Sequence, residues 1–208
     1  MTSTVTTERA SRRAFAPVDI ALVAVFAALV AMLSLVPAIP LAGGVPITLQ
    51  TLGVALAGLA LGPVRGFLAV VLYLLVGFAG LPVFAGGTAG LAALGKPSAG
   101  YLLSFPIAAL LAGLLSRALL RTKLPRYAAL FIAGIGASIL IIHPAGIAGL
   151  MANANMAFGK AALTDLAFWP GDVVKNLVAA GLALAVFKAF PDLFLRRRKR
   201  PAGDNVLR

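Results

Sequence analysis

A carboxylate, an ammonium group and an amide stand close together near the end of the chain, in the stretch FWPGDVVKNLVAAGLALAVF. Lys175 follows Asp172 by three residues and Asn176 follows it by four, so the three side chains share one face of a helix. The rest of the stretch is apolar enough for a membrane span, where each charged side chain costs about 2.5–3.5 kcal/mol on insertion scales. Ionisable residues in spans mark functional sites by default, and this pair suits a ligand with an acidic group and N–H donors.

A purely structural explanation of the same residues stays open. Pro170 and Gly171 suit the start of a helix, and Trp169 suits the aromatic belt at a membrane–water interface. In this interpretation Asp172 and Lys175 only neutralise each other at the interface, and the lysine extends its ammonium group into water.

Two Gly- and Pro-rich stretches supply further polar candidates. In GGVPITLQT, Thr48 offers a hydroxyl and Gln50 an amide, either as part of a lid over a ligand or as a turn followed by a helix cap. The stretch GLAALGKPS, which contains Lys96, comes within one residue of the phosphate-binding pattern G-x-x-x-x-G-K-[ST]. Pro97 replaces the hydroxyl that a magnesium ion needs, so we expect no nucleotide there.

The composition is that of an integral membrane protein. Of the 208 residues 61% are apolar and 12% charged, with a mean hydropathy of +1.02, whereas soluble domains average about 45–50% apolar and about 25% charged. The net charge of +12 does not indicate nucleic acid, because the basic residues gather at the two ends and between apolar runs.

The residue counts exclude thiol chemistry and metal sites built from cysteine or from several histidines. The chain has no cysteine and a single histidine, His143, so no disulfide, thiolate nucleophile or multi-histidine metal centre is expected, and no cofactor is implied. His143 stands directly before Pro144 and is interpreted as a local hydrogen-bonding residue rather than a proton relay.

Six apolar segments predict an all-α polytopic membrane protein with six transmembrane helices and Gly/Pro-rich outer loops. The segments cover 18–36, 48–62, 64–83, 99–120, 127–149 and 167–190. The second is short and rich in Gly and Ala, so it is tilted, buried by its neighbours or continued by the preceding loop. The predicted division is an N-terminal arm at 1–17, a membrane domain at 18–190 and a basic tail at 191–208.

The basic residues predict the orientation in the cell membrane. Six spans place both termini, the gap at 63–65 and the gap at 121–126 on one side. The other side keeps Lys96 and Lys160, and Lys175 lies within the sixth segment, so 15 of the 18 Lys and Arg residues remain for the first side. Basic residues favour the cytoplasm, so both termini are expected there. The terminal LRRRKR then anchors the chain to lipid headgroups.

Small residues on the first segment give it a face for close helix contact. The pairs Ala24/Ala28 and Ala27/Ala31 repeat a small residue every four positions, which lets another helix approach closely in lipid. Because alanine is abundant in this chain, chance explains the spacing equally well.

Taken together, these clusters resemble the BioY family, the biotin-binding S components of energy-coupling-factor transporters. The resemblance lies in VPITLQTLG, LGPVRG, GLPVFAGG, PSAGYLLSFP and GDVVKN, in this order over roughly residues 18–190. It implies a six-helix membrane protein that captures biotin from outside. A transmembrane coupling protein and two cytosolic ATPases would help it pass the vitamin inward. The alternative that the chain works alone, as a homo-oligomer, stays open.

By position, the resemblance also assigns residues. Asp172 and Lys175 match the family's polar pair on the last helix, and Gln50 falls in its first-loop signature. Ala24 and Ala28 match the stripe with which S components meet their coupling partner. One departure is visible, because family members commonly read Gly-Pro-Thr-Gly-Gly-Tyr where this chain reads KPSAGY. Lys96 therefore adds a charge near the entrance of the site.

Biotin carries groups that fit these residues. It has a carboxylate, an apolar chain and ring, and a ureido group with two N–H donors and a carbonyl. Asp172 could accept the ureido N–H groups while Lys175 pairs with the carboxylate, or Lys175 could donate to the ureido carbonyl; the sequence leaves both orientations open. The expected contacts also include Thr48, Gln50 and Asn176, with Phe84, Tyr101, Phe168 and Trp169 as walls for the apolar part.

Two other functions remain as alternatives to biotin transport. One is a carrier for another small carboxylate vitamin, and the other is an intramembrane enzyme. The enzyme is disfavoured because the chain has no HExxH helix, no Ser/His site and no paired carboxylates within its predicted spans. Asp172 is the only carboxylate placed well inside a span, so no catalytic residue is assigned.

Overall fold

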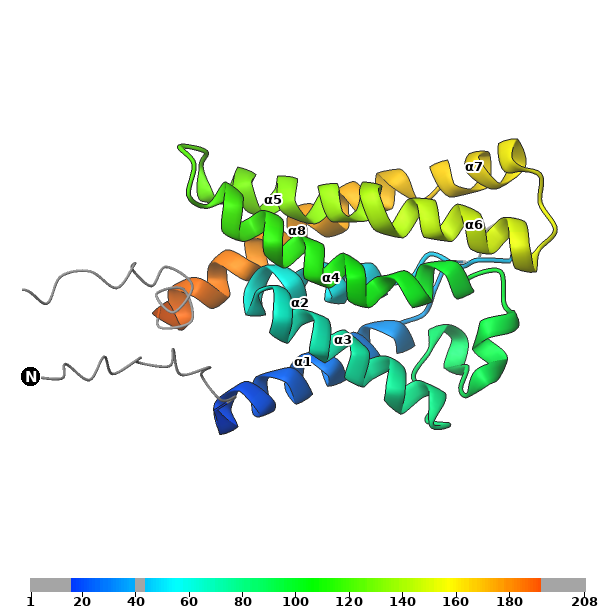
Figure 1. Ribbon diagram of the computed structural model, residues 1–208, viewed down its shortest axis with the longest axis horizontal. Coiled ribbons are helices and arrows are strands. Elements are labelled where there is room, and N and C mark those ends of the chain that lie inside the picture. Colours follow the sequence, from blue (N-terminus) through cyan, green and yellow to red (C-terminus); the bar gives the residue numbers. More distant parts are fainter. Residues whose placement is uncertain (1–15, 40–43, 192–208) are drawn as a thin grey trace, which may run out of the picture.

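The structure is a computed structural model that describes residues 16–39 and 44–191, and almost all of the predicted arm and tail lies outside these residues. Its helices lie roughly along one long axis (Figure 1). In chain order they are α1 Pro17–Leu35, α2 Gln50–Leu61, α3 Pro63–Phe78, α4 Ala99–Leu119, α5 Arg126–Ala137, α6 His143–Asn153, α7 Phe158–Leu166 and α8 Trp169–Ala189. Short 3₁₀ turns lie at Ala85–Gly87 and Leu91–Gly95.

Four helices in the described part are long and apolar enough to cross a membrane. They are α1, α4, α8 and the continuous helix Arg126–Asn153, which joins α5 to α6. The two shorter apolar helices, α2 with 12 residues and α3 with 16, coincide with the second and third predicted segments. The helical membrane fold is thus confirmed, whereas the count of six crossings stays a prediction. Helix α7 was not predicted, because its sequence lies in the gap at 150–166, where Asn153, Asn155 and Gly159 favour a loop.

Helix α2 lies inside the bundle. Ten of its 12 residues are buried, and it packs against α1, α3, α4 and α8. Gly58 marks the closest approach: a Cβ atom added there would lie 2.3 Å from the carbonyl oxygen of Ala109 in α4. Small residues let helix backbones come this close, which explains the Gly- and Ala-rich composition of this segment. Of the three explanations that the sequence allowed, burial by neighbouring helices is the one observed.

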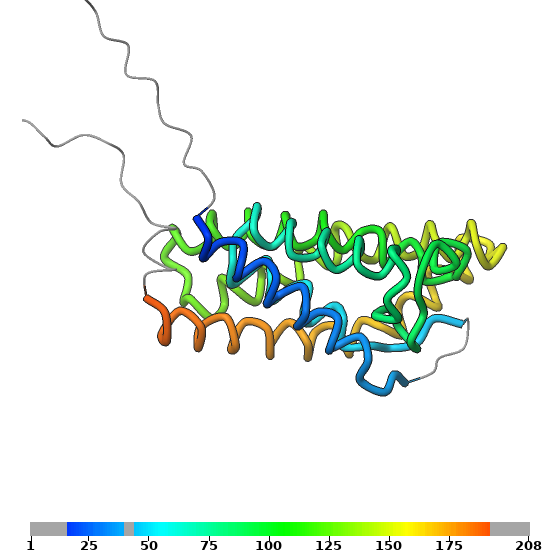
Figure 2. Tube along the Cα trace, turned by 90° about the horizontal axis from the view of Figure 1, so that it is seen from below, coloured from blue at the N-terminus to red at the C-terminus, as the bar shows by residue number. Residues whose placement is uncertain are grey.

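The irregular segments gather at the end of the bundle opposite the first residues of α1 and the last residues of α8 (Figures 1 and 2). The backbones of Ile39 and Ile47 form a bridge with N···O distances of 3.0 and 2.8 Å, and Phe84 bridges to Thr88. The turn between Phe84 and Thr88 uses Gly86 and Gly87 at φ of 68° and 70°, a conformation that favours glycine. These loops and the adjoining helix ends surround the candidate site.

Candidate ligand-binding site

A cavity lies between α2, α4, α8 and the loops at this end of the bundle. Its walls come from residues within 45–51, 84–98, 101–105 and 168–175, together with Ile142. The cavity is partly open to solvent, and its lining combines aromatic and aliphatic side chains with a few polar ones. This combination is typical of sites that bind small organic molecules.

Most of the predicted contact residues line this cavity. The lining includes Thr48, Gln50, Phe84, Tyr101, Phe168, Asp172 and Lys175. Asn176 and Trp169 are not part of it. Asn176 is buried behind Asp172 and donates its Nδ2 to the Asp172 carbonyl oxygen at 2.8 Å. Trp169 is 39% exposed and donates its indole N–H to Asp165 Oδ2 at 3.1 Å.

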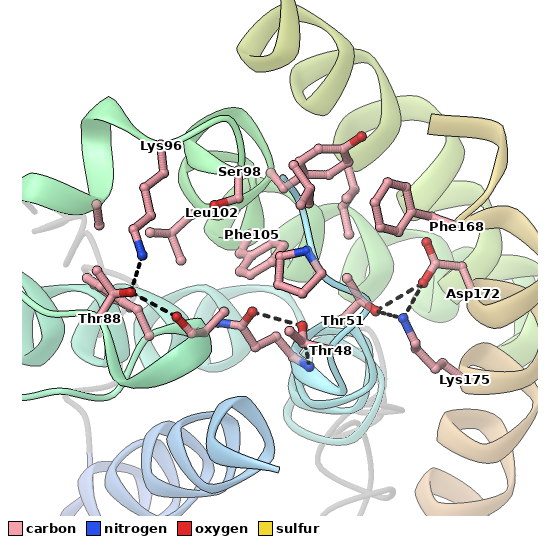
Figure 3. A pocket seen from close by; sticks show the side chains of 18 residues that line it. Thr48, Thr51, Thr88, Lys96, Ser98, Leu102, Phe105, Phe168, Asp172 and Lys175 are labelled. Atoms are coloured by element: carbon pink, nitrogen blue, oxygen red, sulfur yellow. Dashed lines mark hydrogen bonds and ion pairs between the residues drawn. The ribbon is translucent and has the colours of Figure 1, made fainter. Parts of the chain in front are cut away.

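Asp172 and Lys175 form a buried ion pair that Thr51 completes. Lys175 Nζ lies 2.9 Å from Asp172 Oδ1 and 3.1 Å from Thr51 Oγ1, and the threonine hydroxyl donates to Asp172 Oδ1 at 3.1 Å (Figure 3). Lys175 is only 8% exposed, so it does not extend into water as the interfacial explanation requires. Because burial of an ion pair carries a desolvation cost, this geometry favours a functional role.

A second buried carboxylate, Asp165 in α7, stands next to the pair. Its side chain is 2% exposed and accepts hydrogen bonds from Tyr101 Oη at 2.8 Å and from Trp169 Nε1 at 3.1 Å. His143 Nδ1 lies 2.9 Å from Asp165 Oδ2. Asp165 lies in α7, outside the predicted spans, and is a second buried carboxylate beside the one that the sequence placed inside a span.

His143 lies between the two carboxylates. Its Nδ1 faces Asp165, and its Nε2 lies 3.6 Å from Asp172 Oδ2. The ring also packs on Trp169 with centroids 5.1 Å apart. The expectation of a local hydrogen bond is thus corrected: His143 contacts α7 and α8, far along the chain.

A π-helical turn directly precedes His143 and places its ring between Asp165 and Asp172. Pro144 has no backbone N–H and cannot donate to the preceding turn, and the helix widens over Ser138–Ile142. The N–H of His143 then donates to the carbonyl of Ser138, five residues earlier. Such turns recur at functional sites because they redirect a side chain.

Gln50 and Thr48 are fixed in the opposite wall by hydrogen bonds. Gln50 Nε2 donates to Tyr73 Oη at 2.6 Å, and Thr48 Oγ1 donates to Gln50 Oε1 at 2.9 Å. Tyr73 in turn donates to the Val83 carbonyl at 3.1 Å and packs edge-on against Phe84. These contacts join α2 and α3 to the loop after α3, so the wall is held before any ligand arrives.

The charges at the inner end of the cavity favour N–H donors over anions. Two carboxylates, Asp165 and Asp172, face one ammonium group and one imidazole. With a neutral imidazole the cluster carries a net negative charge, and with an imidazolium it is neutral. Neither state attracts an anion, whereas a bound N–H group gains a charge-assisted hydrogen bond to Asp172.

Comparison with known sequences decides the family. The sequence profile described as "BioY family" matches residues 5–192. The chain belongs to the BioY family. The resemblance of the motifs is thereby confirmed.

Relatives in the BioY family match nearly end to end. The biotin transporter BioY of Rhizobium etli is 41% identical over 177 residues, covering 83% of this chain and 95% of the relative. The biotin transporter BioY of Rhodobacter capsulatus is 41% identical over 191 residues, covering 86% and 98%. A crystal structure of the S-component for biotin from an ECF-type ABC transporter superposes with a TM-score of 0.78 at 27% identity, covering 84% of this chain and 95% of that one.

Three residues of this BioY-family site were not assigned from the sequence. Thr51 directly follows the assigned Gln50, and only its tertiary contact with Asp172 in α8 reveals its part in the site. Asp165 lay in a predicted loop, although its spacing of four residues before Trp169 was a usable signal. His143 was noted, and the following proline was the one sign of an unusual backbone there.

Proposed function

We propose that this chain binds biotin in the cavity and takes it up across the cell membrane as the substrate-binding S component of an ECF-type transporter. The buried cluster of Asp172, Lys175 and Thr51 at the end of an aromatic-walled cavity carries the proposal. Asp172 accepts the ureido N–H groups, while Phe84, Tyr101 and Phe168 cover the apolar part. The names of the relatives and of the solved neighbour support this ligand. We propose no enzymatic activity.

Competition binding to the purified chain tests the proposed ligand. Labelled biotin should bind saturably and be displaced by unlabelled biotin, but not by equal concentrations of thiamin, riboflavin or lipoate. Displacement by lipoate as effective as that by biotin would favour a carrier for another carboxylate vitamin. Absence of biotin binding would overturn the proposal.

The proposed partners are a transmembrane coupling protein and two cytosolic ATPases. Support comes from α1, where Ala24 and Ala28 are exposed and Ala27 is buried. The exposed stripe continues through Val25 and Met32, so a second helix could approach α1 at the two alanines. Membrane lipid covers the remaining apolar surface in this proposal. A homo-oligomer that works alone is the alternative, and uptake that persists without the ATPases would favour it.

We propose six membrane crossings with both termini in the cytoplasm. Helix α2 is about 18 Å long at about 1.5 Å per residue, and the loop at 44–49 extends it towards the outer surface. The domain boundaries stay at 18 and 190, with a basic arm and tail on either side. A reporter protein that functions only in the cytoplasm should be active when fused after Arg208, because most basic residues lie on the side that carries both termini. Activity of a reporter that functions only outside the cytoplasm would overturn the count of six crossings.

His143 and Asp165 act as positioning residues in this proposal. Asp165 draws α4, α7 and the start of α8 together through Tyr101, His143 and Trp169. His143 in turn contacts Asp172, the carboxylate that faces the ligand, and thereby restricts its position. Neither Asp165 nor His143 lines the cavity, so they set the position of Asp172 without touching biotin.

Replacing His143 by Leu should weaken biotin binding about tenfold, because loss of a donor to a buried carboxylate costs about 1–3 kcal/mol. Replacement by Gln should keep the affinity within about threefold, since its amide can donate to Asp165. Trp169 is the only tryptophan and packs on His143, so its fluorescence reports the cluster directly. Equal affinities for the Leu variant and the unchanged chain would refute the positioning role.

A further inference from the structure

The two lysines of the cavity differ in their partners. Lys175 is buried and already paired with Asp172. Lys96 is exposed at the mouth, and its Nζ contacts the hydroxyl of Thr88. Among the described residues, no carboxylate forms an ion pair with Lys96. One lysine is therefore neutralised, whereas the other presents a positive charge to the cavity and to water.

These lysines stand at opposite ends of the cavity (Figure 3). Apolar side chains, among them Leu102 and Phe105, line the space between them. The cavity thus presents a free cation, an apolar middle and a carboxylate-rich end. Biotin has the same order of groups along its length: a carboxylate, an apolar chain and ring, and a ureido group with N–H donors.

The backbone of Lys96 is held in place from the neighbouring helix. Asn153 at the end of α6 donates its Nδ2 to the carbonyl oxygens of Leu94 at 2.7 Å and Lys96 at 2.8 Å. A Cβ atom added to Gly44 would lie 3.7 Å from the ring of Pro97, so the loop before α2 meets the Lys96 loop above the cavity. These contacts hold the backbone of Lys96 at the open end of the cavity.

Electrostatics decides which end of the cavity takes the ligand carboxylate. At the inner end it would lie beside Asp172 and near Asp165, and like charges in a low-dielectric site repel strongly. At the mouth it would meet an ammonium group that has no anionic partner. We propose that Lys96 binds the carboxylate of the ligand, so that biotin lies with its ureido ring against Asp172 and Lys175.

This inference rests on the proposed function and chooses between the two orientations that the residues alone left open. It also gives Lys96, which replaces a glycine of the common family pattern, a role in specificity. Free biotin should then be preferred over derivatives whose carboxylate is blocked, such as the amide.

Binding of biotin and of its neutral amide to the purified chain tests the orientation. The Lys96→Gln variant should bind biotin about tenfold more weakly, an effect between those of an exposed ion pair and a buried charged hydrogen bond. Its affinity for the amide should equal that of the unchanged chain, and Lys96→Arg should keep the preference for biotin. High salt should weaken binding of biotin and leave the amide unaffected, because an exposed charge pair is screened.

The matched control is Lys160→Gln, which removes an exposed positive charge in α7 outside the cavity lining and should change neither affinity. Unchanged biotin affinity in Lys96→Gln, or equal losses for biotin and the amide, would overturn the inference. If the unchanged chain binds biotin and the amide equally well, the inference fails and the proposed function stands. If it binds neither, the proposed function itself fails.

Discussion

Replacing Asp172 by Asn should weaken biotin binding by about 30-fold to several thousandfold. Loss of one side of a buried charged contact costs about 2–5 kcal/mol, because the other side stays buried and unpaired. Here the change leaves Lys175, which lies 2.9 Å from Asp172 Oδ1, without its counter-ion. It also replaces the charged acceptor of the ureido N–H groups by a neutral amide oxygen. Calorimetric titration of the purified variant measures the loss.

Lys175→Gln should reduce the affinity by a similar amount, and it distinguishes the two contributions of the pair. If Lys175 faces the ureido carbonyl, the variant should lose affinity for biotin and for biotin amide equally. A loss confined to biotin would assign the ligand carboxylate to Lys175 and contradict the role of Lys96. Thr51→Val, which removes only the bridging hydroxyl, should give a smaller loss of about 1–2 kcal/mol. Affinity for Asp172→Asn within threefold of the unchanged chain would refute the ligand site.

Ala28→Trp should abolish biotin uptake by cells while changing the affinity of the purified chain for biotin by less than about twofold. Close helix contact in a membrane tolerates only small side chains, and Ala28 lies on the exposed face of α1, outside the cavity lining. Uptake of labelled biotin by cells that supply the coupling protein and ATPases gives the first value. Equilibrium binding gives the second.

The control for Ala28→Trp is Leu182→Trp on α8, where the native leucine is 43% exposed. This variant places the same bulky ring on the apolar surface and should leave both uptake and binding intact. Equal losses of uptake and binding in Ala28→Trp would indicate a packing defect instead of a docking defect. Full uptake would show that the two alanines do not contact a partner.

The long helices were predictable because their apolar runs determine both position and length. The first predicted segment, at 18–36, differs from α1 by one residue at each end, and the last, at 167–190, contains α8 entirely. The bounds of α2 also lie within two residues of the predicted segment at 48–62, but its burial by neighbouring helices was only one of three explanations that the sequence left open. Helix α7 was not predictable in this way, because the Asn and Gly residues in the gap before α8 suggested a loop.

Residues of the candidate site were predictable where they lie together on a single helix. Asp172 and Lys175 share a helix face, so their spacing alone indicated a polar pair. Asp165 depends instead on Tyr101, which lies 64 residues away in the sequence, and no local pattern encodes that contact. The contact of Lys96 with Thr88 likewise depends on a loop conformation that includes three glycines at positive φ.

If Asp172 and Lys175 hold biotin, replacing both by apolar residues should abolish binding and leave the chain folded. Biotin binding is measured at equilibrium for the unchanged chain and for the double variant Asp172→Leu/Lys175→Met, with thermal unfolding of both as the check on folding. Removing both partners of a buried ion pair is often neutral or stabilising for the fold, so the double variant should unfold at a similar or higher temperature. It should bind no biotin at concentrations that saturate the unchanged chain. A folded double variant that binds biotin with unchanged affinity would show that Asp172 and Lys175 do not hold the ligand.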